Sequence, residues 1–204
     1  KEDKKRATPH IMAIKLDEIE SVFYLSSMIV DLPNIILNKL GNSRKSKRYG
    51  QFFSRIYMNY DKQVFNGPPE NNKDRIISCC FLLVKGDWKK CKDEIFNIKI
   101  FKKYKNEEQI YNSLIQNCKI VALRCFLLNY LKVYSSLNLN VLAKKFEMEN
   151  KQIKRIINEM ILEEEINAKW NEDILVVESE EGDNCKMTKK LLDNVITTTK
   201  INTE

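Results

Sequence analysis

The chain has 204 residues, of which 43% are hydrophobic, enough for one large domain or two small packed ones, and this composition argues against global disorder. Only five glycines and four prolines are present, which favours helices over a turn-rich β architecture. The net charge of +7 comes mainly from lysine, and a codon bias toward Lys, Asn and Ile explains it as well as a nucleic-acid partner does.

The residue patterns typical of catalytic and metal sites are missing. The one histidine, His10, lies in a polar N-terminal segment, and the six cysteines form no C-x-x-C pair. No G-x-S-x-G, P-loop or G-x-G-x-x-G motif occurs. We therefore expect no enzyme activity, no catalytic residues, no metal, no cofactor and no small-molecule substrate.

The sequence shows no sign of a membrane protein or a secreted protein. No run of about 20 apolar residues is present, and the charged N-terminal residues lack the apolar segment of a signal peptide. The cysteine pattern fits a reducing compartment. We therefore expect a cytoplasmic protein with no membrane partner.

Helical spacing of apolar residues predicts the elements of the first part of the chain. After a flexible tail over 1–13, it indicates helices over 14–30, 34–40, 46–65, 72–85 and 88–97. Pro33 is expected to end the first helix, because the residue before a proline avoids the α region. Short helices joined by tight turns indicate stacked helix pairs, solenoid-like, over 14–136, although no repeat recurs at a fixed period.

A long helix and a different pattern follow. The helix expected over 107–134 is apolar nearly all round from 120 to 131, so it should be buried on several faces and join the two parts of the chain. Helices over 139–146 and 151–163 and strands over 166–170 and 174–177 then give the order of a winged-helix unit, assigned to 137–178. A polar loop and a C-terminal amphipathic helix are expected within 179–204. The predicted fold class is mainly α.

Several short motifs between about residues 16 and 177 keep an order and spacing that are similar to those of a known family. They include Glu20-Ser21-Val22-Phe23, Gly67-Pro68-Pro69-Glu70, Gly86-Asp87-Trp88-Lys89 with Cys91, Leu123-Arg124, Phe146-Glu147 and Met160-Ile161 with Glu164-Glu165. Together they resemble the C-terminal region of the c subunit of eukaryotic translation initiation factor 3. That family implies a PCI domain, in which stacked helices are capped by a winged helix.

The resemblance implies a function as well as a fold. It implies a non-catalytic scaffold subunit of initiation factor 3, which binds partner PCI subunits through its winged helix, above all the a subunit of the same factor. Such a scaffold supports recruitment of the 40S ribosomal subunit and mRNA. Two alternatives remain open: a scaffold component of the proteasome lid or signalosome with the same fold, and a stand-alone RNA-binding helical module.

The wing supplies the candidate partner-binding site. Its first strand alternates apolar with polar residues, which predicts one buried face and one wet face. The second strand, 174–177, is apolar throughout, which predicts an interior strand covered on both sides and leaves the first strand at the edge. A proline at Lys169 would test this edge if the N–H there points outward. The candidate partner-binding residues are Ile166, Asn167, Ala168, Lys169 and Trp170 in the wing, with Leu191 and Val195 in the C-terminal helix.

Charge places any RNA contact in the helical part. From 139 to 177 the winged unit has six basic and eight acidic residues, whereas nucleic-acid modules are positive. The segment 39–62 has seven basic residues against one acidic, and 85–105 has eight against three. A solvated lysine-rich surface remains the alternative to RNA binding there. The candidate RNA-binding residues are Lys45, Lys47, Arg48, Lys102 and Lys103.

Overall fold

A computed structural model describes residues 15–40, 49–60, 62, 67–98, 100–101, 106–131 and 133–177. Several expectations lie outside these residues. They are the N-terminal tail, the C-terminal helix with Leu191 and Val195, and the candidate RNA-binding residues Lys45, Lys47, Arg48, Lys102 and Lys103.

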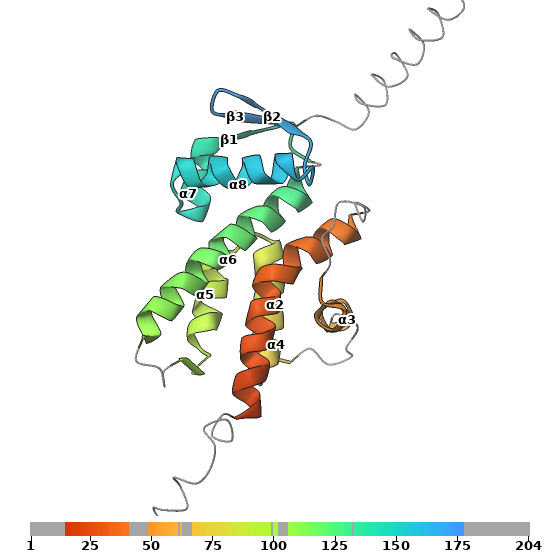
Figure 1. The fold of residues 1–204 in the computed structure, drawn as a ribbon, viewed down its shortest axis with the longest axis vertical. Helices are drawn as coiled ribbons and strands as arrows, with labels where there is room; N and C mark the ends of the chain where they lie inside the picture. The colour runs from red at the N-terminus through yellow and green to blue at the C-terminus, as the bar shows by residue number, and fades with distance from the viewer. Residues whose placement is uncertain are drawn as a thin grey trace, which may run out of the picture.

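The first five described helices form the stacked part of the fold (Figure 1). They are α2 (Leu16–Lys39), α3 (Gln51–Tyr60), α4 (Asn72–Val84), α5 (Trp88–Phe96) and α6 (Glu107–Tyr130). α4 and α5 form a helix pair around Gly86, whose φ of +80° is a conformation that glycine adopts without a Cβ penalty. α2 packs against α4 and α6, and α3 packs against α2. The expected mainly helical fold is therefore confirmed.

The break expected at Pro33 is wrong, because α2 continues through it. Proline lacks the N–H that would bond to the carbonyl of Ile29, which costs about 3 kcal/mol in a helix interior. Tertiary packing offsets this cost, since Leu32, Ile35 and Leu37 are fully buried and each contributes roughly 1.5–3 kcal/mol. Burial around the proline thus decides the local structure.

α2 also meets the length and composition test for a membrane-crossing helix, although the sequence has no uninterrupted apolar run of that length. Its most apolar window has a mean hydropathy of 1.3, but half of that window is buried inside the protein. A helix packed against α4 and α6 in this way is typical of the core of a helical stack.

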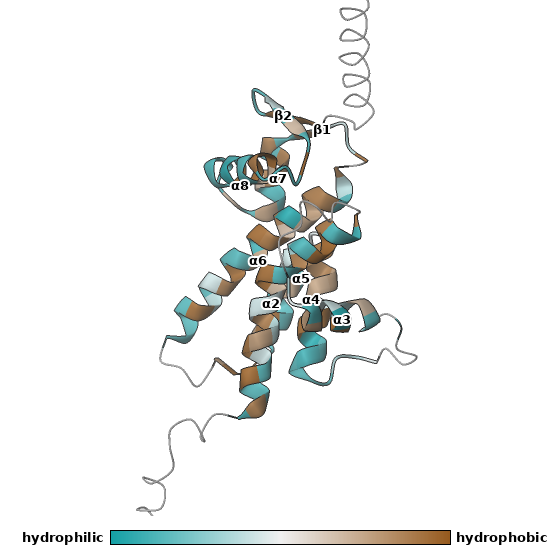
Figure 2. Cartoon of the chain, turned by 45° about the vertical axis from the view of Figure 1, so that its right-hand side comes forward, coloured by the Kyte–Doolittle hydropathy of each residue, from teal (hydrophilic) through white to brown (hydrophobic). Residues whose placement is uncertain are grey.

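α6 joins the stack to the winged unit, as its apolar sequence predicts. It contacts α2, α4 and α5 on one side and α7 (Leu139–Phe146) and α8 (Asn150–Leu162) toward its C-terminus. Figure 1 shows α7, α8 and the small sheet gathered at that end of α6. Figure 2 shows hydrophobic and hydrophilic segments interspersed along the helices.

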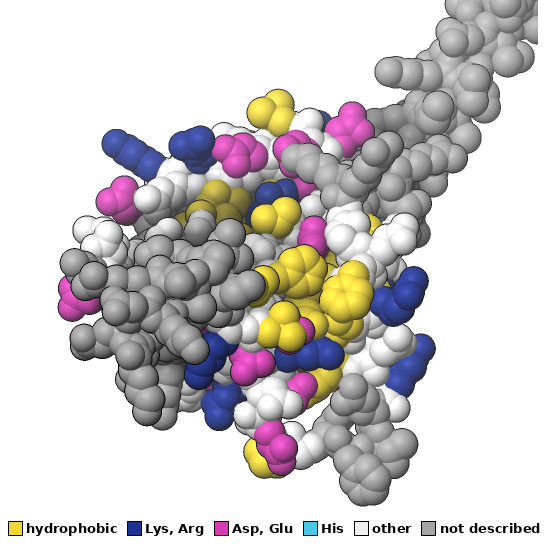
Figure 3. All heavy atoms as spheres, turned by 60° about the horizontal axis from the view of Figure 1, so that its bottom comes forward, with side chains coloured by type: hydrophobic (Ala, Val, Ile, Leu, Met, Phe, Trp, Pro, Cys, Tyr) yellow, Lys and Arg dark blue, Asp and Glu magenta, His cyan; other side chains and the backbone are white. Residues whose placement is uncertain are grey.

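The core contains unpaired cysteines, and apolar side chains of α2 and α3 form an exposed patch. Cys79, Cys80, Cys91, Cys118 and Cys125 are all buried free thiols, as expected for small apolar side chains in a helical core. Phe23 of α2 and Phe52 of α3 are exposed, and their ring centroids lie 6.1 Å apart. Figure 3 shows hydrophobic side chains gathered on one face of the molecule with charged residues around them.

Candidate docking edge of the winged helix

A three-stranded antiparallel sheet completes the winged unit. Its strands are β1 (Ser136–Asn138), β2 (Ala168–Asn171) and β3 (Ile174–Val177), in the order β1-β3-β2. The wing strand β2 therefore lies at an edge, as expected. Within the residues that the structure describes, β2 pairs with β3 alone. β1 has only three residues and was not predicted from the sequence.

The register shows which backbone groups of β2 face the open edge. Val177 donates its N–H to Ser135, and Leu139 donates to Asp173, so the odd-numbered residues of β3 point toward β1. Val176 and Ile174 must then point toward β2, where they face Lys169 and Asn171. The backbone groups of Ala168 and Trp170 consequently point outward.

This geometry corrects the choice of test residue. The N–H of Lys169 points inward to β3, so a proline there would break the pairing of the wing itself. The outward N–H groups belong to Ala168 and Trp170. Sequence reasoning missed this distinction because the direction of an N–H depends on the register between strands.

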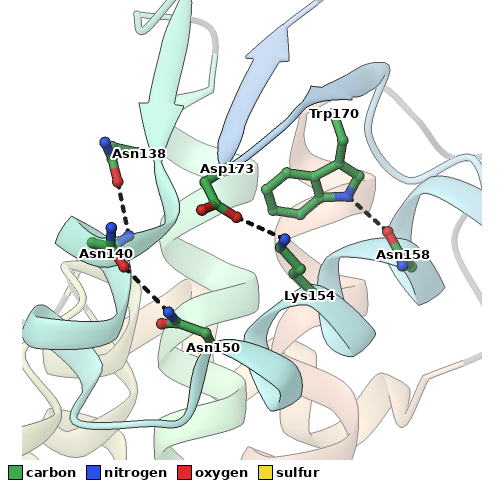
Figure 4. A network of polar contacts seen from close by, with 7 residues as sticks. All are labelled: Asn138, Asn140, Asn150, Lys154, Asn158, Trp170 and Asp173. Carbon is green, nitrogen blue, oxygen red and sulfur yellow. Dashed lines mark hydrogen bonds and ion pairs between the residues drawn. The ribbon is translucent and has the colours of Figure 1, made fainter.

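The inner face of the sheet is fixed to α8. Ile166, Ala168 and Leu175 are buried. The indole N–H of Trp170 donates to Asn158 Oδ1 at 2.7 Å, and Lys154 Nζ donates to Asp173 Oδ1 at 2.8 Å (Figure 4). The wing is therefore held to α8 at two points, and the alternation predicted for the first wing strand is confirmed.

The outer face of the sheet is less covered than the sequence suggested. Ile174 is 41% exposed and Val176 is 37% exposed, whereas Leu175 between them is fully buried. The expectation that β3 is covered on both sides is therefore wrong within the described part of the chain. The reason is that α8 covers only the inner face, so the apolar outer side chains of β3 lie beside the candidate docking edge.

The exposed face of α8 is poorly suited to nucleic acid. Lys154 is paired with Asp173, and Arg155 pairs with Glu159 in the next turn at 3.0 Å. Cations that are neutralised by neighbouring carboxylates are less free to replace the counterions of phosphates. The ion pairs on α8 and the acidic balance of the winged unit therefore both argue against nucleic-acid binding at this face.

The buried thiols are expected to be unreactive. Burial raises the pKa of Cys80 and Cys125, and hydrogen bonds with Cys118 and Cys79 raise the pKa of Cys91. A thiol with a raised pKa carries little of the reactive thiolate at neutral pH. In the described part of the chain, no group of three or more His, Cys, Asp or Glu residues is placed to hold a metal ion.

The winged unit is tied to the stack by side chains that reach the end of α7. Trp88 Nε1 donates to the carbonyl of Lys145 at 3.0 Å, and Lys119 Nζ donates to the carbonyl of Glu147 at 3.2 Å. The Lys145 carbonyl lies in the last turn of α7 and the Glu147 carbonyl directly follows the helix, where carbonyls have no partner within the helix. The contacts join segments far apart in the sequence, so no local pattern predicts them.

Comparison with known proteins agrees with this architecture. Residues 88–181 match the PCI domain family. Similar curated proteins include the C subunit of eukaryotic translation initiation factor 3 of Yarrowia lipolytica, 34% identical over 164 residues, which are 80% of this chain and 20% of that protein. The protein of the same name in Mycosarcoma maydis is 32% identical over 86% of this chain, and that of Caenorhabditis briggsae is 30% identical over 99%.

The match covers most of this chain but little of its relatives. The chain spans about a fifth of the length of the curated relatives it matches. The similarity therefore concerns one module, in which the stacked helices end in a three-stranded winged helix. With the family match and the relatives' shared name, this module shows that the chain belongs to the PCI-domain family, in the branch of the C subunit of eukaryotic translation initiation factor 3.

Proposed function

We propose that the chain is a non-catalytic scaffold module of initiation factor 3 in the cytoplasm, and that it docks a partner subunit along the edge of β2. The observation that carries this proposal is the outward direction of the backbone groups of Ala168 and Trp170. An edge of this kind offers unsatisfied N–H and C=O groups to another strand. The occupant is the winged helix of a second PCI protein of the factor, and its a subunit is the first candidate.

The surroundings of the edge favour a protein partner over RNA. The exposed Ile174 and Val176 beside the edge offer apolar area to a second sheet, while the acidic balance of the winged unit opposes phosphate. A stand-alone RNA-binding module would need the basic segments of the helical part. Support of 40S ribosomal subunit and mRNA recruitment then follows from membership in the larger complex.

A proline scan of the two sheet edges tests the proposal. Ala168→Pro removes an outward N–H from β2, and Ser136→Pro removes an outward N–H from β1 at the opposite edge, so Ser136→Pro is the control for the other edge of the same sheet. Both should keep the helical circular dichroism of the parent. We expect the Ala168→Pro variant alone to lose co-purification with the partner subunit. Equal binding by both variants would contradict docking at β2.

A further inference from the structure

The connection between α8 and β2 is joined to helix α6 by an ion pair in which the carboxylate is buried and the arginine is part-buried. Arg124 of α6 donates through a guanidinium nitrogen to Glu165 Oε1 at 2.5 Å, and the same nitrogen lies 3.6 Å from Glu163 Oε2. Glu165 is only 5% exposed. It stands directly before Ile166, whose buried side chain leads into the edge strand. The pair thus fastens the start of β2 to α6.

A second cation on α6, this one buried, fastens the other helix of the winged unit. Lys119 is only 8% exposed, and its ammonium group lies 4.3 Å from the centre of the Trp88 ring. The same group donates to the carbonyl of Glu147, at the C-terminus of α7. A cation is favourable there because the helix dipole places negative charge at that end. Trp88, Lys119 and α7 therefore form one desolvated contact.

Buried charges of this kind are poorly explained by stability alone. Removing a carboxylate and a guanidinium from water costs free energy that their attraction repays only in part, and apolar residues of similar size often hold a fold equally well. Among the residues that the structure describes, the buried Nε atom of Arg124 and the buried Oε2 atom of Glu165 have no hydrogen-bond partner, so the pair is not fully compensated. Directional contacts do, however, select one geometry over others.

We propose that Lys119 and Arg124 are positioning residues, which fix the edge of β2 at one angle to the helical stack. Each acts through a different end of the winged unit: Lys119 through the end of α7, and Arg124 through Glu165 at the start of the wing. Two attachment points on one rigid helix prevent rotation of the unit about a single contact. The functional meaning of this fixed angle rests on the proposed docking function, because a scaffold must hold its partner in one orientation.

Distances between two spin labels measure this angle directly. Cysteines are introduced at exposed positions on the stack and the winged unit, Glu20→Cys in α2 and Gln152→Cys in α8, with Cys185→Ser to remove that thiol. We expect one narrow distance distribution for this parent protein by double electron–electron resonance. Lys119→Met and Glu165→Gln should broaden or shift it, and Lys119→Arg should restore most of the narrow distribution.

The matched control removes an exposed bridge at the same junction. Lys89 pairs with Glu147 at 2.7 Å, but the two side chains are 68% and 50% exposed, so Lys89→Met should leave the distribution unchanged. Glu165→Gln keeps the shape of the side chain and remains informative if Lys119→Met fails to fold. Folded Glu165→Gln protein with the parent distribution would overturn the proposal. If the Ala168→Pro variant binds the partner normally while these distributions still broaden, docking at β2 fails and the positioning role stands.

Discussion

Trp88, the first residue of α5, donates its indole N–H to the backbone carbonyl of Lys145 in α7 across 57 residues of sequence. The nitrogen–oxygen distance is 3.0 Å, and Trp88 is only 5% exposed to solvent. One side of the indole also faces the ammonium group of Lys119. Trp88 therefore both packs in the helical stack and supplies a hydrogen-bond donor to the C-terminal end of α7.

The first prediction concerns this bond. Trp88→Phe keeps an aromatic ring but removes the indole N–H, so the Lys145 carbonyl loses this hydrogen bond. We expect a loss of about 1–2 kcal/mol in the free energy of unfolding, measured by urea denaturation. Trp88→Ala should lose roughly 3–5 kcal/mol, because a cavity is added. A Trp88→Phe variant as stable as the parent would show that the bond contributes nothing net.

A second prediction concerns the end of α8. Glu164 has a φ of +56°, and Glu165 N–H donates to Met160 while Glu164 N–H donates to Ile161, the pattern of a Schellman motif. Glycine adopts this conformation without strain, so Glu164→Gly should stabilise the protein by up to about 1 kcal/mol.

The control for the Glu164 variant lies in the same helix. Glu159→Gly, within the exposed helical face, should instead destabilise the protein by about 1 kcal/mol. Thermal unfolding of the two variants measures both effects. Losses of the same size at both positions would contradict a left-handed Glu164.

The buried thiols predict a dependence of stability on pH. The pKa values of Cys80, Cys91 and Cys125 are raised in the folded protein, so the unfolded chain releases these protons first. Their contribution to stability is complete below about pH 8.5 and falls as the pH rises, by about 1.4 kcal/mol per thiol for each further pH unit.

Urea denaturation at pH 7.5 and pH 9.5 measures this fall. Cys125→Ala removes one titrating thiol and should make the fall smaller by about 1.4 kcal/mol at pH 9.5. An identical pH dependence in the parent and the Cys125→Ala variant would show that the pKa of Cys125 is not raised in the folded protein.

The fourth prediction separates the two basic surfaces. The triple change of Lys45, Lys47 and Arg48 to Glu should weaken any RNA binding more than the same change at Lys151, Lys154 and Arg155. The first set lies in a segment with surplus positive charge, whereas Lys154 and Arg155 are already paired with carboxylates. Filter binding at one fixed salt concentration gives the comparison. Equal losses in the two triple variants would count against it.

Sequence reasoning predicted the helix order and the winged unit because both depend on local periodicity. The stripe of Ile153, Ile156, Ile157 and Met160 in α8, for example, is buried as its spacing predicts. Pro33 misled the prediction because long-range burial overrode a local preference. β1 was missed because Ser136-Leu137-Asn138 is too short to show alternation and becomes a strand only by pairing with β3.

The site was only partly predictable for a related reason. The edge position of β2 follows from the usual order of a winged helix, but the inward N–H of Lys169 follows from the register with β3. The charges of Arg124 and Glu165 meet across 41 residues, which no spacing rule reports. Among the three consecutive glutamates at 163–165, Glu165 is buried, and only the three-dimensional structure distinguishes it.

Residue-specific amide hydrogen exchange on the full chain, with and without the partner subunit, tests the central claim most directly. In the free protein, the amides of Lys169 and Asn171 should exchange slowly because the register pairs them with β3, while the outward amide of Trp170 exchanges fast. Adding the partner should slow the Trp170 amide at least about tenfold, which corresponds to about 1.4 kcal/mol. Partner binding that leaves this amide as fast as before would contradict docking at the edge of β2.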